Sequence, residues 1–188
     1  MKMLFAGVLV FAVLHWLPAA APGFRKRLAG GMGDNVWKGL FTLLIIGSIT
    51  LMVVGWRSSE GVEIYRAPEW GYIAAFICML AMSVMFFAPY MNTNFRRLVR
   101  HSQLTGIVLF GIGHLAAAGN LRTIVLFGGL AAWAFLEILF LNRRDGVWEK
   151  PEPVSRAADV RLLVAGTGFF LIFLFMHEAF FGSRPLPF

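Results

Sequence analysis

The sequence predicts an all-α protein: a polytopic membrane helical bundle of about six transmembrane helices, with both termini on the non-cytoplasmic side. The 188 residues are 59% hydrophobic and 14% charged, whereas soluble domains carry about 25% charged residues. The mean hydropathy is +0.72. Several apolar stretches approach the ~20 residues that cross a bilayer. We therefore interpret residues 1–188 as a single transmembrane domain whose main partner is the lipid bilayer.

Six apolar stretches define the expected spans. They are Met3 to Leu17 or Ala21, Trp37–Trp56, Gly71–Tyr90, Leu104 to about Gly119, Arg122–Leu141 and Val160–Phe181. Pro18 and Pro22 are expected to close the first span, and Gly119-Asn120 to form a tight turn after the fourth. The first stretch resembles a signal peptide, but a strongly basic loop follows it. We therefore expect a retained span.

The basic residues predict the orientation. Twelve of the 17 lie in the first, third and fifth loops: Arg25, Lys26, Arg27, Lys38, Arg96, Arg97, Arg100, Arg143, Arg144, Lys150, Arg156 and Arg161. Because Lys and Arg collect on the cytoplasmic side, both termini are expected outside the cytoplasm. No basic run interleaved with aromatic residues lies outside the apolar stretches, so we expect no nucleic-acid partner.

All four histidines lie in or beside apolar stretches. His114 is ten residues inside the fourth stretch, about 15 Å from its polar entry. His15 is twelve residues from the outer end of the first stretch, and the two depths are expected to agree. A titratable group at this depth is costly and indicates a functional site. Two imidazoles facing each other from different helices would suit the axial positions of a haem iron.

Other interpretations remain open for these residues. Either histidine could serve a proton or substrate role, or could be a hydrogen-bonded packing residue. The small residues near His114 leave room for a bulky ring or for close helix contact; they are Gly106, Gly111, Gly113, Ala116, Ala117 and Ala118. The lone cysteine, Cys78, excludes an internal disulfide and is expected to be a small buried side chain.

Four further residues are candidate site members. Arg100 and His101 lie at the polar entry of the fourth stretch, where a histidine commonly binds lipid headgroups or caps a helix. Glu137 lies near the inner end of the fifth stretch and could pair with Arg100 or with an inward-facing histidine. His177, followed by Glu178, lies near the outer end of the sixth stretch. We expect either an interfacial polar pair or a second polar cluster there.

Several sequence blocks, in order along nearly the whole chain, resemble the NnrU family of bacterial membrane proteins. The most specific is R-H-S-Q-L-T-G-I-V-L-F-G-I-G-H-L-A-A-A-G-N-L at residues 100–121. The others are L-V-F-A-V-L-H, P-G-F-R-K-R-L, W-K-G-L-F, A-P-E-W, L-F-G-G-L-A-A-W-A, N-R-R-D and H-E-A-F-F-G-S-R-P-L-P. The resemblance implies a multi-pass protein of the bacterial inner (cytoplasmic) membrane.

The resemblance also implies chemistry. Bacterial members are associated with denitrification, specifically nitrite and nitric oxide reduction. The family includes the plant plastid 15-cis-zeta-carotene isomerase, a membrane enzyme that holds haem b and isomerises a carotenoid. Its haem ligands match His15 and His114 by position in the motifs. Ser102 replaces the usual proline of the family's R-H-P entry. Gly111 stands where the plant enzyme has a cysteine, so a cysteine-for-histidine ligand switch has no counterpart here.

Three functions follow as expectations. The first is a haem b protein with redox or isomerase chemistry on an apolar substrate, or with a role in nitrite and nitric oxide reduction. The second is a non-catalytic accessory or assembly factor for respiratory nitrogen-oxide reductases, with proteins of that chain as partners. The third is a membrane methyltransferase using S-adenosylmethionine, whose R-H-P-x-Y-x-G entry is echoed by Arg100, His101 and Gly106 but not by Ser102 and Leu104.

Overall fold

The computed structural model describes residues 1–185, and over that range the chain is helical without a β-strand. Six longer helices form the body: α1 (Lys2–Ala20), α3 (Asp34–Arg57), α4 (Gly71–Phe87), α5 (Ser102–Ala117), α7 (Gly129–Asp145) and α8 (Arg156–Phe181). The shorter elements are α2 (Pro22–Met32), α6 (Leu121–Thr123), the 3₁₀ turns η1 (Ala88–Tyr90) and η2 (Asn94–Arg97), and the π-helical turn η3 (Ile124–Gly128).

Five helical segments of the described chain are long and apolar enough to cross a membrane. They are Lys2–Ala20, Asp34–Arg57, Gly71–Tyr90, Leu121–Asp145 and Arg156–Phe181. The sixth expected span, α5, is a shorter apolar helix of 16 residues. It rises about 24 Å, less than the ~30 Å of a hydrocarbon core. The expected helical membrane bundle is therefore confirmed with five candidate spans, and α5 packs inside it between α4 and α7.

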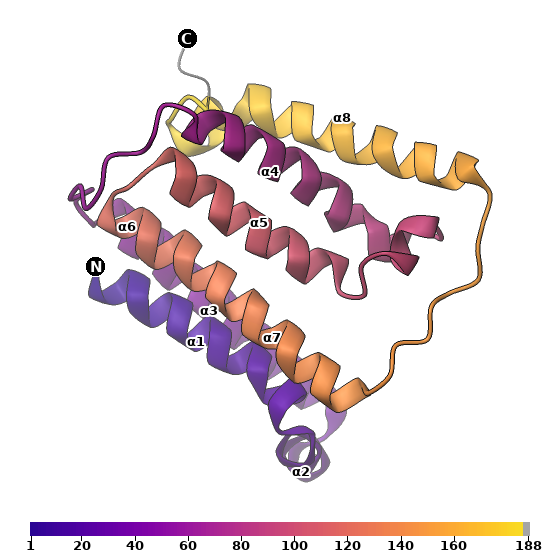
Figure 1. The fold of residues 1–188 in the computed structure, drawn as a ribbon. Helices are drawn as coiled ribbons and strands as arrows, with labels where there is room; N and C mark the ends of the chain where they lie inside the picture. The colour runs from indigo at the N-terminus through magenta and orange to yellow at the C-terminus, as the bar shows by residue number, and fades with distance from the viewer. Residues whose placement is uncertain (186–188) are drawn as a thin grey trace.

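The helices follow one another in space in the order α3, α1, α7, α5, α4, α8 (Figure 1). The closest pairs are α4 with α5 and α1 with α3, followed by α5 with α7. This order separates α1 from α5, because α7 lies between them. The start of α1 and the end of α8 lie at the same end of the array, because the chain runs back and forth through six longer helices. Which side of the membrane this end faces stays a prediction.

Glycines mark the places where the helices come closest. A Cβ atom added to Gly111 would lie 2.5 Å from the Cβ atom of Ala131 on α7. A Cβ atom added to Gly113 would lie 2.9 Å from the Cβ atom of Cys78 on α4. Small residues that let backbones approach are typical of helix contacts in membranes, where lipid provides no hydrophobic drive for association. Of the two uses expected for the glycines near His114, the structure shows close helix contact.

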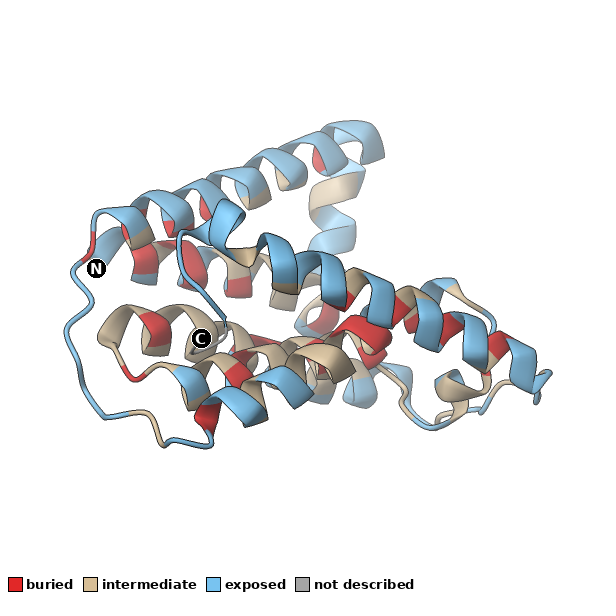
Figure 2. Cartoon of the chain, turned by 90° about the horizontal axis from the view of Figure 1, so that it is seen from above, coloured by how far each residue is buried: buried red, intermediate tan, exposed pale blue. Residues whose placement is uncertain are grey.

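The outward surfaces of the array are apolar. Figure 2 shows exposed residues running along the outer faces of the helices, with buried residues confined to the seams between them. Large side chains such as Leu43, Val164 and Phe175 are exposed at 67%, 68% and 79%. In water such a surface would be an aggregation hazard, so its extent indicates contact with lipid.

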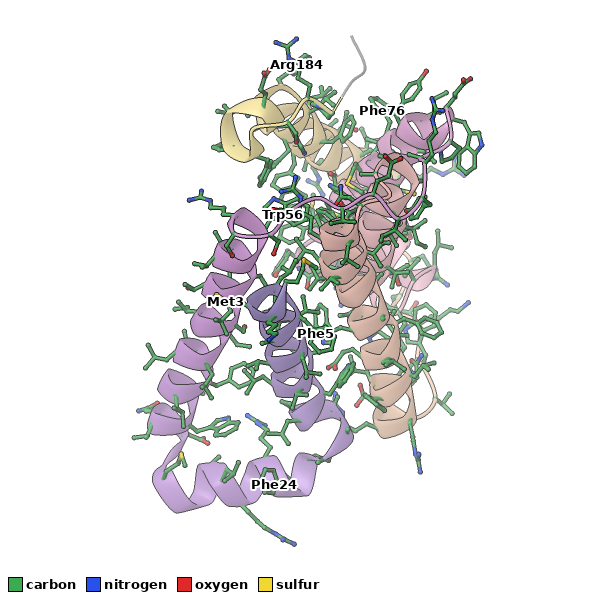
Figure 3. The ribbon with its side chains drawn as sticks, turned by 90° about the vertical axis from the view of Figure 1, so that its left-hand side faces the viewer. Met3, Phe5, Phe24, Trp56, Phe76 and Arg184 are labelled. Atoms are coloured by element: carbon green, nitrogen blue, oxygen red, sulfur yellow. The ribbon has the colours of Figure 1, made fainter. Side chains whose placement is uncertain are left out.

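Two expectations for the first loop are wrong. Pro18 lies inside α1, only two residues before the helix ends at Ala20, whereas Pro22 follows that end as expected. Residues 22–32, expected to be a loop, form α2 with Pro22 in its first turn, a position that proline favours. Figure 3 shows α2 lying across the ends of α1 and α3, with Phe24 labelled on it. Its basic residues and the half-exposed Phe24 are typical of a helix in the membrane interface.

The connection expected at Gly119-Asn120 is short, but it is extended rather than a tight turn, because Asn120 forms an antiparallel β-bridge with Glu63. The Gly119 carbonyl accepts hydrogen bonds from the backbone N–H groups of Ile64 and Tyr65 at 2.8 and 3.1 Å. The Asn120 side chain caps the next helix by accepting from the Thr123 backbone N–H at 3.0 Å. The polar connection after α3 therefore folds over the end of α5 and closes that end of the bundle.

Candidate functional site

His15 lies near the end of α1, against α7. Its Nδ1 atom is 2.9 Å from the Phe11 carbonyl oxygen, one turn earlier on the same helix. Its ring lies 5.0 Å from the Trp133 ring in an edge-to-face arrangement and 4.1 Å from the Phe11 ring. Phe41 of α3 lies 5.9 Å away. The imidazole is thus held in an aromatic setting built by three helices.

His114 lies near the end of α5, on the other side of α7. Its Nδ1 atom is 2.9 Å from the Phe110 carbonyl oxygen, again one turn earlier. The ring stacks on Phe127 with centroids 4.0 Å apart and an interplanar angle of 11°. Phe127 belongs to the π-helical turn η3, which re-aims side chains relative to a regular helix. This local irregularity is what presents the Phe127 ring to His114.

The two histidines share one local design. Each closes the pattern F-x-x-x-H, Phe11 to His15 and Phe110 to His114, and each ring packs against its own phenylalanine. A carbonyl oxygen only accepts, so in the neutral ring Nδ1 carries the proton and Nε2 carries the lone pair. A metal-binding histidine commonly donates its other N–H to a backbone carbonyl in this way. Both rings therefore have the tautomer that suits ligation through Nε2.

The structure does not bring the two rings into contact. Their aromatic partners, Phe127 of η3 and Trp133 of α7, are six residues apart, roughly 9 Å along the helical segment Leu121–Asp145. That the two rings lie at equal depth in the membrane stays a prediction. Two axial nitrogens on one iron lie within about 4 Å of each other, since a metal–imidazole bond is about 2 Å. Ligation of a single iron by both His15 and His114 requires the side chains between them to make room.

The third F-x-x-x-H pattern, Phe173 to His177, behaves differently. The Nδ1 atom of His177 is 2.8 Å from the Ser183 carbonyl oxygen, beyond the end of α8. Glu178 instead pairs with Arg184 at 3.0 Å, with both side chains more than half exposed. Of the two alternatives for His177 and Glu178, this geometry matches an interfacial polar arrangement.

Arg100 and His101 are bound at the start of α5. Arg100 donates to the Asn142 side chain at 3.1 Å and to the Gly146 carbonyl at 2.8 Å. The His101 Nε2 atom lies 3.1 Å from the same Asn142 oxygen. Burial lowers the pKa of His101, and the hydrogen bond to Asn142 opposes that effect. The pair joins the start of α5 to the end of α7, far along the helix from His114.

Glu137 pairs with none of the partners expected for it. Arg100 is used by Asn142 and Gly146, and no hydrogen bond of the described residues reaches the Oε2 atom of Glu137. The side chain is 8% exposed. One turn earlier on α7, the Nε1 atom of the buried Trp133 also has no partner in the described chain. Trp133 and Glu137 thus place two unpartnered polar atoms four residues apart on α7, and His15 packs against the Trp133 ring.

No three His, Cys, Asp or Glu side chains of residues 1–185 come together as ligands for a bare metal ion. An open hollow of about 530 Å³ lies at the α2–α3 junction, away from the histidines; Arg25, Lys26, Ala29, Gly30, Gly33 and Asp34 line it. The chemistry offered along α7 is therefore that of isolated imidazoles in aromatic surroundings, not that of a multidentate metal cage.

A family model described as NnrU protein matches residues 3–185. The chain belongs to the NnrU family. The match covers nearly the whole chain and all the helices described above. No curated protein and no solved structure matches the chain. The resemblance seen in the sequence blocks is thereby confirmed, and the activity of this NnrU protein must be argued from its own residues.

The sequence interpretation did not identify the aromatic partners of the two histidines on η3 and α7. Phe127 and Trp133 both lie in the block L-F-G-G-L-A-A-W-A, which was used only for the family resemblance. A tryptophan in the middle of an apolar span is a detectable signal, because tryptophan is otherwise enriched at the membrane interfaces. The π-helical turn that aims Phe127 has no comparable signal in the sequence.

Proposed function

We propose that this NnrU protein binds haem b inside the membrane through the imidazoles of His15 and His114 and uses it in redox or isomerase chemistry. The observation that carries the proposal is the shared tautomer: each Nδ1 proton is committed to a carbonyl oxygen of its own helix, at 2.9 Å in both cases. Each Nε2 atom therefore keeps a lone pair that no hydrogen bond of the described residues uses. This donor set fits an iron porphyrin.

The protein's own residues would supply three things. Phe110 and Phe11 hold the ligand rings in fixed orientations through their carbonyl oxygens. The aromatic rings of Phe127 and Trp133 exclude water and lower the local dielectric, which affects the redox potential of a bound group. The lipid-facing apolar surfaces would allow an apolar substrate to arrive from the bilayer. Bound haem would supply one-electron chemistry or bind a nitrogen oxide.

The test is the visible spectrum of the detergent-purified protein, oxidised and dithionite-reduced. We expect a Soret band with sharp α and β bands after reduction, indicating low-spin haem. Loss of these bands in His114→Ala and in His15→Ala would support both ligands. His101→Ala and His177→Ala are matched controls, because each removes an imidazole that is hydrogen-bonded at a helix end. Both controls are expected to keep the spectrum.

Three results would change the proposal. A colourless protein, expressed with haem supplied, would contradict haem binding and favour a non-catalytic accessory role. A spectrum lost in His114→Ala but kept in His15→Ala would leave His114 as a ligand and exclude His15. A spectrum kept in His114→Ala but lost in His177→Ala would move the site to the end of α8.

A further inference from the structure

Two polar atoms on one face of α7 are buried without a hydrogen-bond partner among residues 1–185. They are the Nε1 atom of Trp133 and the Oε2 atom of Glu137, in side chains exposed at 5% and 8%. Residues four apart on a helix lie one above the other, so the two side chains share the same face. Trp133 Nε1 can only donate, whereas a carboxyl group can accept or, when protonated, donate. Buried polar atoms of native proteins are almost always paired, so this arrangement needs an explanation.

Glu137 forms no ion pair with any of residues 1–185. On its own helix Arg144 is the cation whose charge reaches it, but the Arg144 guanidinium is paired with Asp145 at 2.6 Å. At the start of α5, Arg100 and His101 bind Asn142. Farther along α5 the side chains in this seam are apolar: Leu104, Ile107 and Val108.

The α1 side contributes His15, whose Nδ1 proton is committed to the Phe11 carbonyl and whose ring lies against Trp133. Trp16 of α1 uses its own N–H on the Trp133 carbonyl at 3.2 Å. Behind His15, α3 contributes the ring of Phe41. A carboxylate without a cation is very costly in such a setting, and a neutral carboxyl is much less so.

We propose that Glu137 is a proton-carrying carboxyl of the membrane interior, protonated at neutral pH and exchanging its proton with water from the Arg100–Asn142 end. Release leaves a carboxylate, and the unpartnered Trp133 N–H is the donor positioned to stabilise it, directly or through one water molecule. Uptake reverses this: one proton adds to one carboxylate oxygen. Glu137 lies eight residues from the end of α7 at Asp145, about 12 Å, a distance that water must bridge. This site does not depend on haem.

Labelling with dicyclohexylcarbodiimide tests the proposal in the full-length protein. A protonated carboxyl adds to this apolar carbodiimide and rearranges to a stable N-acylurea, so the labelled residue gains the mass of the whole reagent. We expect mass spectrometry to find the label on Glu137, at a yield that falls as the pH rises. Glu137→Gln should abolish it. Glu178→Gln is the matched control, because Glu178 is exposed and paired with Arg184, and it should leave the Glu137 label unchanged.

Trp133→Phe separates the proposed role from mere burial. Without the N–H donor the carboxylate form is less stable, so labelling of Glu137 should persist to higher pH than in the unmodified protein. Labelling that is independent of pH, or an unchanged pH profile in Trp133→Phe, would overturn the proposal.

Infrared spectroscopy tests the protonation of Glu137 without requiring a reagent to reach the buried carboxyl. A protonated carboxyl gives a C=O band that shifts in heavy water, and this band should be absent from Glu137→Gln. No such band would also overturn the proposal. Helix content measured by circular dichroism verifies that each variant is folded, and Glu137→Asp, which keeps the carboxyl, should retain the label.

Discussion

The histidines on the two sides of α7 lie in different surroundings. On the α5 side, His114 stacks on Phe127, and glycines bring α5 against α7 and α4, so the seam is tight and apolar. On the α1 side, His15 meets Trp133 edge-on, and unpartnered polar atoms of Trp133 and Glu137 lie nearby. The local F-x-x-x-H pattern is the same in both. What differs is the neighbouring helix face: close glycine contacts line the α5 side, whereas unpartnered polar atoms lie on the α1 side.

The largest expected effect on stability is at the close contact between α5 and α7. Gly111→Ala places a Cβ atom 2.5 Å from the Cβ atom of Ala131, so α5 and α7 must separate. We expect a loss of about 1–3 kcal/mol in the free energy of unfolding, the usual cost of overpacking. Titration of the purified protein from mild detergent into a denaturing detergent measures it.

Gly168→Ala is the matched control for Gly111→Ala. Gly168 lies in α8, and an added Cβ atom there meets nothing within 4 Å. Replacing glycine by alanine at such a helical position stabilises by up to about 1 kcal/mol. Equal stability of the two variants would contradict the close contact between α5 and α7.

A smaller effect is expected from the stacked pair. Phe127→Leu keeps an apolar side chain but removes the ring that covers His114. Aromatic pairs contribute about 0.5–1.5 kcal/mol beyond the area they bury, so the double-mutant cycle with His114→Ala should show a coupling of that size. The same cycle for His15 and Trp133→Leu reports on the other side. A larger coupling energy for the pair His15 and Trp133 than for the pair His114 and Phe127 would contradict the closer ring contact on the α5 side.

The sequence predicted the membrane spans more accurately than the segments that connect them. The ends of α3 lie within three residues of the expected Trp37–Trp56, because tryptophans and charges mark a membrane boundary clearly. The basic segment after α1 was expected to be a loop because clustered Arg and Lys residues are typical of cytoplasmic loops, but they are equally typical of a helix in the membrane interface. The shortness of α5 follows from the polar loop that folds onto its end at Leu115 and Gly119, a tertiary contact invisible in apolar runs.

The individual residues of the candidate site were predictable from the sequence, but their arrangement in space was not. His15 and His114 were identified because an imidazole in an apolar stretch is conspicuous. Their separation by α7 was not, since the spatial order α3, α1, α7, α5, α4, α8 depends on which glycine faces meet. The pairing expected for Glu137 failed for a similar reason: the amide of Asn142, one residue among many polar ones, takes both Arg100 and His101.

A still smaller difference in stability is expected between variants of the two tryptophans in the α1–α7 seam. Trp16→Phe removes the 3.2 Å hydrogen bond to the Trp133 carbonyl, and a typical bond contributes about 0.5–1.5 kcal/mol. Trp133→Phe removes a donor that has no partner, so at a pH where Glu137 is protonated it should cost less than Trp16→Phe. Unfolding of both variants in detergent measures this order. The reverse order would show that the Trp133 N–H already has a stabilising partner.

The smallest effect concerns pH at the start of α5. Burial lowers the pKa of His101 in the folded protein below its ordinary value of about 6.5, so the unfolded chain binds the proton more readily. The stability contributed by the neutral ring is therefore present above about pH 6.5 and is lost as the pH falls below it. Thermal unfolding in detergent should show a steeper loss between about pH 7.5 and 5.5 than in His101→Gln. His177→Gln should keep the steeper loss, and a His101→Gln variant that also kept it would assign this pH dependence to another group.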